Sequence, residues 1–269
     1  MTRKFQSHLA MLCFSILIAG SFSLGSIIAN DISPIAFTAV RFTLAAFIVG
    51  LIAFSTGSVT KSALKSPWRY LVLGGTLSIH FVLMFEGLKT ASPISTVSVF
   101  TLIPVMSAVI GFAVLGQIIN IQIISALIIG VIGALWVIFR ADVQALSMLS
   151  VGRGEIIYFM GCVAYAFTPI LFRLLNRGEN PLMATFGMLI SGGVILSFFG
   201  ASEIIKIDWM GLPIRVWITL LYVSIFASAI TFALVQFASM HLRAANVLAY
   251  TYLTPTWVLV WEFLLGHNI

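Results

Sequence analysis

The sequence predicts an all-α integral membrane protein, and three observations lead to that fold class. Apolar residues make up 61% of the 269 residues and charged residues 8%, with a mean hydropathy of +1.13. Such a chain has too little polar surface to cover a soluble globule, so lipid must be its solvent. The apolar runs are near twenty residues long, which suits helices crossing about 30 Å of hydrocarbon rather than alternating barrel strands. Thirdly, one short pattern occurs twice.

The apolar runs predict nine membrane-spanning helices in chain order. Their expected ranges are 9–29, 34–54, 70–88, 94–114, 119–139, 155–175, 181–200, 216–237 and 244–265. Turn residues separate several runs, and Pro34, Pro93 and Pro181 fall where a helix would begin. A proline at the first helical position costs little, because its missing N–H would have no partner there. The first run is longer than a signal-peptide core, so it is expected to remain as a span.

Loop charge predicts a cytoplasmic N-terminus. With that orientation eight basic residues lie inside, five lie outside and Arg41 falls within a span, in line with the excess of basic residues in cytoplasmic loops. The inside set is Arg3, Lys4, Lys61, Lys65, Arg69, Arg173, Arg177 and Arg243, and the outside set is Lys89, Arg140, Arg153, Lys206 and Arg215.

The repeated pattern indicates an internal duplication. "LIPVMSAVIGFAVLGQ" (102–117) and "LTPTWVLVWEFLLGH" (253–267) share a Leu-x-Pro start, an apolar run and a Leu-Gly end. "PIAFTAVRFTLAAFIVG" from Pro34 matches "PLMATFGMLISGGVILS" from Pro181 in the same relative place. The repeating unit holds about 150 residues and five spans in its first copy. Because five is odd, the second copy would enter the membrane upside down, as in many secondary transporters.

These motifs resemble the EamA-like permeases of the drug/metabolite transporter (DMT) superfamily. The resemblance rests on Pro34 followed by Arg41-Phe42, on "EGLKTASPISTVSVFTLIPVMSAVIGFAVLGQ" from Glu86, and on "QFASMHLRAANVLAYTYLTPTWVLVWEFLLG" from Gln236. It implies two inverted five-helix repeats around a central cavity, with domains at 1–140 and 151–269. The family usually has Glu where this chain has Gln117 and His267. Nothing follows Ile269, so the second repeat is expected to lack its last helix.

The resemblance implies a multi-pass secondary transporter in the cell membrane, as in a bacterial inner membrane. Its expected activity is efflux of a small metabolite or amino-acid-like compound by alternating access, coupled to protons or by exchange. The alternative is an inactive truncated remnant or a noncatalytic membrane partner. We expect no enzyme activity, because no catalytic or phosphate-binding motif occurs, and no cofactor or metal. The expected partners are a small-molecule substrate and membrane lipid, with homo-oligomers allowed and nucleic acid excluded, since the basic residues are scattered.

Ionisable side chains inside the apolar runs are the first candidates for a substrate cavity, since charges at membrane depth are costly. Arg41 could attract a carboxylate, or could form a structural pair with an acidic side chain. Glu86 and Lys89 stand three residues apart, which also suits a local ion pair. His80 could carry protons or serve as a hydrogen-bonded packing residue. Glu262 could couple transport to protons, or could lie at the headgroup level beside an aromatic belt.

Polar and aromatic residues on two further spans complete the candidate list. Tyr165 and Thr168 stand one turn apart and precede Pro169, which could form a kink or a binding contact. Asn246 and Tyr250 stand one turn apart near the start of the last run. Trp257 could line the cavity with Tyr250, or could belong to an interfacial belt.

Overall fold

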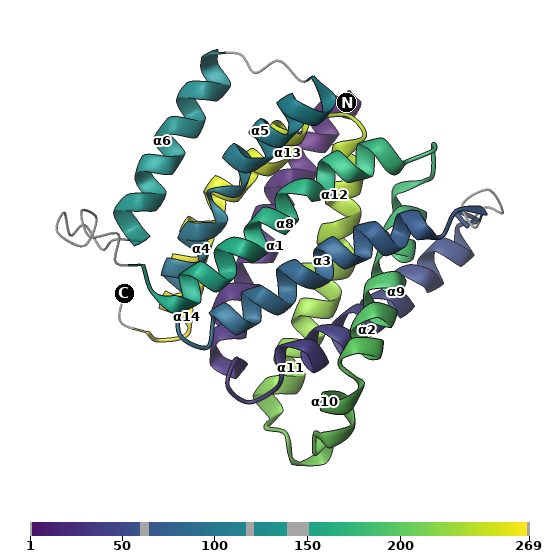
Figure 1. Cartoon of the computed structure of the whole chain (residues 1–269), viewed down its shortest axis with the longest axis vertical. Helices are drawn as coiled ribbons and strands as arrows, with labels where there is room; N and C mark the ends of the chain where they lie inside the picture. The colour runs from purple at the N-terminus through teal and green to yellow at the C-terminus, as the bar shows by residue number, and fades with distance from the viewer. Residues whose placement is uncertain (1, 60–64, 117–120, 139–150, 268–269) are drawn as a thin grey trace.

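The computed structural model describes residues 2–59, 65–116, 121–138 and 151–267, and all regular structure within these ranges is helical (Figure 1). Ten helices come from the first part and the centre of the chain: α1 (Arg3–Ile28), α2 (Pro34–Ser55), α3 (Trp68–Gly87), α4 (Pro93–Phe100), α5 (Ile103–Leu115), α6 (Ile121–Ile138), α8 (Arg153–Leu175), α9 (Pro181–Phe199), α10 (Ala201–Lys206) and the 3-10 turn η2 (Trp209–Gly211). The remainder comprises α11 (Ile214–Ser224), η3 (Ile225–Ile230), α12 (Thr231–Ser239), α13 (Ala244–Leu248), η4 (Ala249–Leu253) and α14 (Thr254–Leu264).

The long apolar helices confirm an all-α protein that crosses a membrane several times. In the described ranges, seven segments are long and apolar enough to span a bilayer: Arg3–Ile28, Pro34–Ser55, Trp68–Gly87, Pro93–Leu115, Arg153–Leu175, Pro181–Phe199 and Ile214–Ser239. They coincide with seven of the nine predicted runs. The other two runs are also helical, as α6 and as the series α13, η4 and α14.

The helix caps confirm the helix starts predicted at three prolines. Pro34, Pro93 and Pro181 begin α2, α4 and α9. In each case the preceding side chain accepts a hydrogen bond from a backbone N–H of the first turn, which replaces an intrahelical partner that turn lacks. The capping residues are Ser33, Ser92 and Asn180.

Both Leu-x-Pro runs are interrupted helices, whereas the sequence predicted each as one helix. The first run breaks at Thr101 and Leu102, between α4 and α5. The second run changes from α-helical to 3-10-helical geometry in η4, between α13 and α14. Pro104 and Pro255 explain the breaks, because a proline lacks the N–H for the preceding turn and its ring clashes with the carbonyl four residues back. Pro169, in contrast, lies inside the continuous helix α8.

Glycines let α3 approach two other helices closely. A Cβ on Gly74 would lie 2.6 Å from backbone atoms of Gly192 and Met188 in α9. A Cβ on Gly87 would lie 2.7 Å from the carbonyl oxygen of Gly154 in α8. Small residues at crossings allow backbones to pack in lipid, where no hydrophobic force drives association. The α3 helix therefore packs closely against both α8 and α9.

Candidate functional site

The most unusual residue of the bundle is Arg41, in the second turn of α2. Its side chain is 0% exposed. Nε donates to the Ser228 hydroxyl oxygen at 2.6 Å, and one terminal nitrogen donates to the Ala227 carbonyl oxygen at 2.8 Å. Both partners are neutral, so these bonds orient the guanidinium without neutralising its charge.

The partners of Arg41 belong to a π-helical segment, η3 (Ile225–Ile230), within the span formed by α11 and α12. Ser228 donates its own hydroxyl hydrogen to the Val223 carbonyl at 2.7 Å, which leaves its oxygen lone pairs to accept from Arg41. A π-helical turn shifts the backbone ladder by one residue, and such turns are frequent at functional sites. Here the irregular turn presents a carbonyl and a hydroxyl to a buried cation.

An aromatic face completes the surroundings of Arg41. The guanidinium carbon lies 4.0 Å from the centroid of the Phe81 ring and 6.0 Å from that of Phe85, both in α3. Among the described residues, the ion pairs that the structure records all lie elsewhere, so the predicted pairing of Arg41 with an acidic side chain is absent there. The other terminal nitrogen, Nη1, is buried and has no hydrogen-bond partner. A buried, unneutralised cation with a free donor is suited to hold an anion.

His80 and Tyr165 pack together next to Phe81. The His80 and Tyr165 rings lie 4.5 Å apart between centroids, and Tyr158 and Phe100 complete the stack around His80. His80 Nδ1 is 3.0 Å from the Gly161 carbonyl oxygen, which can only accept, so Nδ1 carries the hydrogen. Since all of these side chains are buried, the cluster is closed to both sides of the membrane in this conformation.

Two further candidates, Thr168 and Glu262, are buried and incompletely bonded. The Thr168 hydroxyl, one turn beyond Tyr165 on α8, has no partner. The Glu262 side chain is 8% exposed; one oxygen accepts from His267 Nδ1 at 2.8 Å, and the other has no partner. Trp257, five residues before Glu262 on α14, also has an unpartnered indole N–H. Such unsatisfied groups inside a bundle mark places where water or a ligand can bind.

Three candidates from the sequence lie away from the Arg41 cluster. Glu86, in the last turn of α3, is partly exposed and pairs at 2.7 Å with Lys89, in the turn that follows the helix. The Tyr250 hydroxyl, in η4, lies 3.0 Å from Nδ1 of the exposed His8 in α1. Asn246 is half-buried in α13. The structure therefore brings Arg41, His80 and Tyr165 together, whereas Glu86 and Tyr250 have their partners elsewhere.

Comparison with known proteins identifies the family. The model of the EamA-like transporter family matches residues 6–139 and again residues 152–269. The chain belongs to the EamA-like transporter family. It is 26% identical over 265 residues to "Uncharacterized transporter YyaM" of Bacillus subtilis (strain 168), a match that covers 97% of this chain and 87% of that protein. One crystal structure shares the fold with a TM-score of 0.72 at 16% identity, over 99% of this chain and 88% of that one.

The polar interior of the bundle contains residues that the sequence did not indicate. The sequence indicated Arg41, His80 and Tyr165, but it missed Phe81, Ser228 and Gln236. Gln236, in α12, is buried; its amide lies 3.3 Å from the Met188 sulfur, and its Oε1 has no partner. An amide in the middle of an apolar run was the available signal for Gln236. Phe81 and Ser228 gave none, because phenylalanine and serine are ordinary residues of packed membrane helices.

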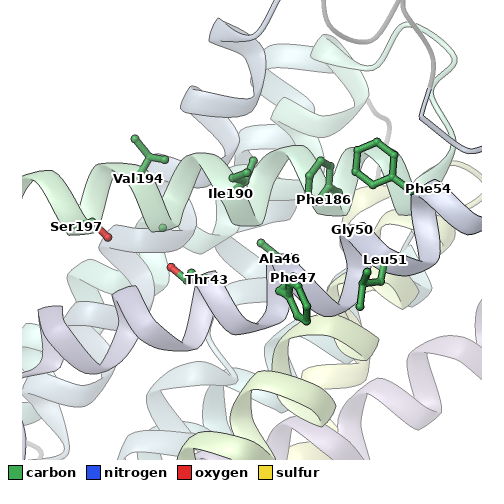
Figure 2. Close-up of a pocket in the computed structure, with 11 residues that line it drawn as sticks. Thr43, Ala46, Phe47, Gly50, Leu51, Phe54, Phe186, Ile190, Val194 and Ser197 are labelled. Carbon is green, nitrogen blue, oxygen red and sulfur yellow. The ribbon is translucent and has the colours of Figure 1, made fainter. Parts of the chain in front are cut away.

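Two grooves along α2 of this EamA-like protein do not contain the polar cluster. Figure 2 shows a cleft of about 680 Å³ between α2 and α9, with Phe47, Phe54 and Val194 along it. A second cleft of about 600 Å³ adjoins it toward α10 and α11 and shares Thr43, Phe47 and Ser197 with the first. Their walls are almost wholly apolar, and they lie on the outer surface of spanning helices. These grooves suit acyl chains of the bilayer, whereas Arg41 faces the interior.

Proposed function

We propose that this EamA-like transporter moves a small carboxylate-bearing metabolite, with Arg41 as the group that binds the carboxylate. The observation that carries this proposal is the buried guanidinium, which is held by neutral partners and keeps Nη1 free. A carboxylate would accept from Nη1 in a charge-assisted hydrogen bond and neutralise the cation at once. Binding energy is then available from a charge that the protein leaves uncompensated.

Alternating access is the proposed mechanism, supported by the closed cluster and by the repeat. Because Arg41, His80 and Tyr165 are buried from both sides, a substrate reaches them only if one end of the bundle opens. The family model matches two segments, which suit our proposed domains 1–140 and 151–269. The interruptions before Pro104 and Pro255 stand in corresponding places. An odd number of spans in the first copy would invert the second, as alternating access between equivalent packings requires.

Coupling to protons or exchange with a second solute would drive the transport. Glu262 supports the proton arm, because its carboxylate is buried and one oxygen is unpartnered. A pH gradient imposed across proteoliposomes distinguishes proton coupling from exchange. Proton coupling predicts that the gradient drives uptake and that Glu262→Gln abolishes this gradient-driven uptake. Exchange predicts uptake that needs solute inside and ignores the gradient.

Loop charge supports a cytoplasmic N-terminus. Efflux across the cell membrane is the direction we propose. Reporter insertions test the orientation directly. A reporter inserted after Gly57, between α2 and α3, should behave as cytoplasmic. A reporter inserted after Met210, in η2, should behave as external, and the reverse pattern would refute the cytoplasmic N-terminus.

A ligand-dependent thermal shift tests the carboxylate proposal. The purified protein is heated with matched compounds that differ only in a carboxylate or the corresponding carboxamide. A ligand at about 100 times its Kd stabilises the folded state by about 2.7 kcal/mol, so a binding carboxylate should raise Tm measurably. Arg41→Lys should keep part of the shift, Arg41→Met should remove it, and Arg153→Gln, an exposed arginine at the start of α8, should leave it unchanged. Equal shifts with carboxamides would refute the role of Arg41.

A further inference from the structure

Two ion pairs join the first and second halves of the chain. Arg69, at the start of α3, lies 2.6 Å from Glu179, in the connection between α8 and α9. Arg215, at the start of α11, lies 2.7 Å and 2.8 Å from the two carboxylate oxygens of Asp31, in the connection between α1 and α2. Neither pair takes part in the site around Arg41.

The two pairs occupy corresponding positions in the sequence. Arg69 is the third residue of Pro-Trp-Arg and Arg215 the third residue of Pro-Ile-Arg, and each is the second residue of its helix. Asp31 and Glu179 stand three and two residues before the prolines that begin α2 and α9. The arginines are 146 residues apart and these prolines 147, so one repeat relation connects both members of both pairs.

The pairs lie at opposite ends of the bundle. Consecutive long helices run back and forth, so the connection after α1 and the start of α3 are one helix length apart. In Figure 1, α10 and the start of α11 lie at the lower end, whereas the N-terminus and the start of α3 lie toward the other end. An inverted repeat would produce this arrangement, because it exchanges the two ends while it exchanges the two halves.

We propose that these pairs are equivalent latches, one at each end, and that an end opens to the substrate only when its own pair separates. This inference rests on the proposed alternating access. Each latch closes a connection between spans of one half onto the first turn of a helix of the other half. An opening between the halves at that end therefore has to pull the two charges apart.

The latches differ in burial, so their removal has different consequences. The side chains of Arg69 and Glu179 are 2% and 6% exposed, and Arg69 also donates to the Leu175 carbonyl at 2.6 Å. The side chains of Arg215 and Asp31 are 55% and 19% exposed. Loss of Glu179 leaves a buried cation without a counter-charge in the closed state, whereas Arg215 stays hydrated without Asp31. Neutralising Glu179 should therefore open its end far more than neutralising Asp31 opens the other.

A native thiol can report the opening. Cys162 is fully buried on α8, next to Gly161, whose carbonyl accepts from His80. In a Cys13→Ser background, which removes the exposed cysteine of α1, only Cys162 remains of the two cysteines. Sealed proteoliposomes of known orientation are treated with a membrane-impermeant maleimide from one side at a time. The labelling rate of Cys162 then measures how often each end opens.

Glu179→Gln should raise the labelling rate at least about tenfold from the Glu179 side alone. Asp31→Asn should raise it about two- to fivefold from the Asp31 side alone. The matched control is Lys89→Gln, which breaks an ion pair confined to the end of α3 and the turn after it, within one half of the chain, and should leave both rates unchanged. If Glu179→Gln does not yield monodisperse protein, the double variant Arg69→Gln with Glu179→Gln removes both buried charges and should raise labelling from the same side.

Equal changes from both sides, or unchanged rates in Asp31→Asn and Glu179→Gln, would overturn the latch proposal and make these pairs static braces. Labelling needs no substrate, so it fails or succeeds independently of the proposed carboxylate transport. A protein with sided latches but no carboxylate-dependent thermal shift would retain the latches and lose the substrate assignment.

Discussion

The guanidinium carbon of Arg41 lies 4.0 Å above the Phe81 ring, across the contact between α2 and α3. A buried cation usually pairs with an acidic side chain. Here the cation–π contact and two neutral hydrogen-bond acceptors hold the guanidinium instead. Without a bound anion, the buried guanidinium has no counter-charge, so the empty site carries a cost in free energy. That relationship yields the first two predictions.

Arg41→Met should preserve or raise the stability of the empty protein. Methionine has a similar length, and replacing a buried charge by an apolar side chain removes a desolvation cost. Thermal unfolding in detergent, followed by size exclusion, measures this. A large fall in Tm would mean that the charge is a structural requirement rather than a binding group.

Phe81→Leu should weaken carboxylate binding about 2- to 30-fold, since cation–π contacts contribute about 0.5–2 kcal/mol, most where the cation is desolvated. The loss comes from a less firmly positioned guanidinium. Titration of the thermal shift gives the change in affinity. Phe47→Leu, on the 63% exposed side chain at the lipid-facing groove, is the matched control and should bind as the wild type does.

Gly74→Ala should lower the stability by about 1–3 kcal/mol, because the new methyl group meets backbone atoms of α9 that have no room to yield. The adjacent Gly75→Ala offers a sharp comparison. A Cβ there would lie 3.8 Å from the flexible end of Ile195, and alanine favours the helix by about 1 kcal/mol over glycine. Tm should therefore fall in the first variant and hold or rise in the second. Equal effects would show that the α3–α9 crossing is looser than described.

Acid should lower the stability of the folded protein, because it protonates Glu179. Burial opposes ionisation of Glu179, but the ion pair with Arg69 and the backbone N–H of Arg177 outweigh it, so the pKa of Glu179 is lowered from its ordinary value of 4.5. A lowered folded-state pKa means that this stabilisation is complete above about pH 4.5 and is lost as the pH falls through the lowered value. Tm recorded against pH should show that loss in the wild type. A Glu179→Gln variant with the same acid profile would assign the loss to another group.

Composition and run length were sufficient for the fold class, because membrane solvent imposes helices on any chain with such spans. Helix starts at Pro34, Pro93 and Pro181 followed from local chemistry alone. The breaks before Pro104 and Pro255 could not be predicted from local chemistry. A proline near the middle of an apolar run can kink a helix, end it, or be accommodated within it, as Pro169 is in α8. Neighbouring helices decide which of these occurs.

The site was partly visible in the sequence because a charge inside an apolar run is exceptional, which indicated Arg41. Its partners depended on tertiary geometry: the π-helical turn at Ser228 has no local sequence signature. The three-residue spacing already offered the local Glu86–Lys89 ion pair, which the structure shows. Tyr250 was indistinguishable from an interior residue until its contact with His8 was known. The two Pro-x-Arg sequences, which contain Arg69 and Arg215, could not be interpreted from the sequence. The structure shows that each arginine pairs with an acidic residue of the other half.

Solute counterflow in proteoliposomes tests the central claim most directly. Vesicles loaded with the carboxylate that gives the largest thermal shift are diluted into a trace of the same labelled compound. The account predicts transient accumulation by the wild type, none of the matched carboxamide, and none by Arg41→Met at equal protein incorporation. Accumulation of the carboxylate by Arg41→Met at the wild-type rate would contradict it.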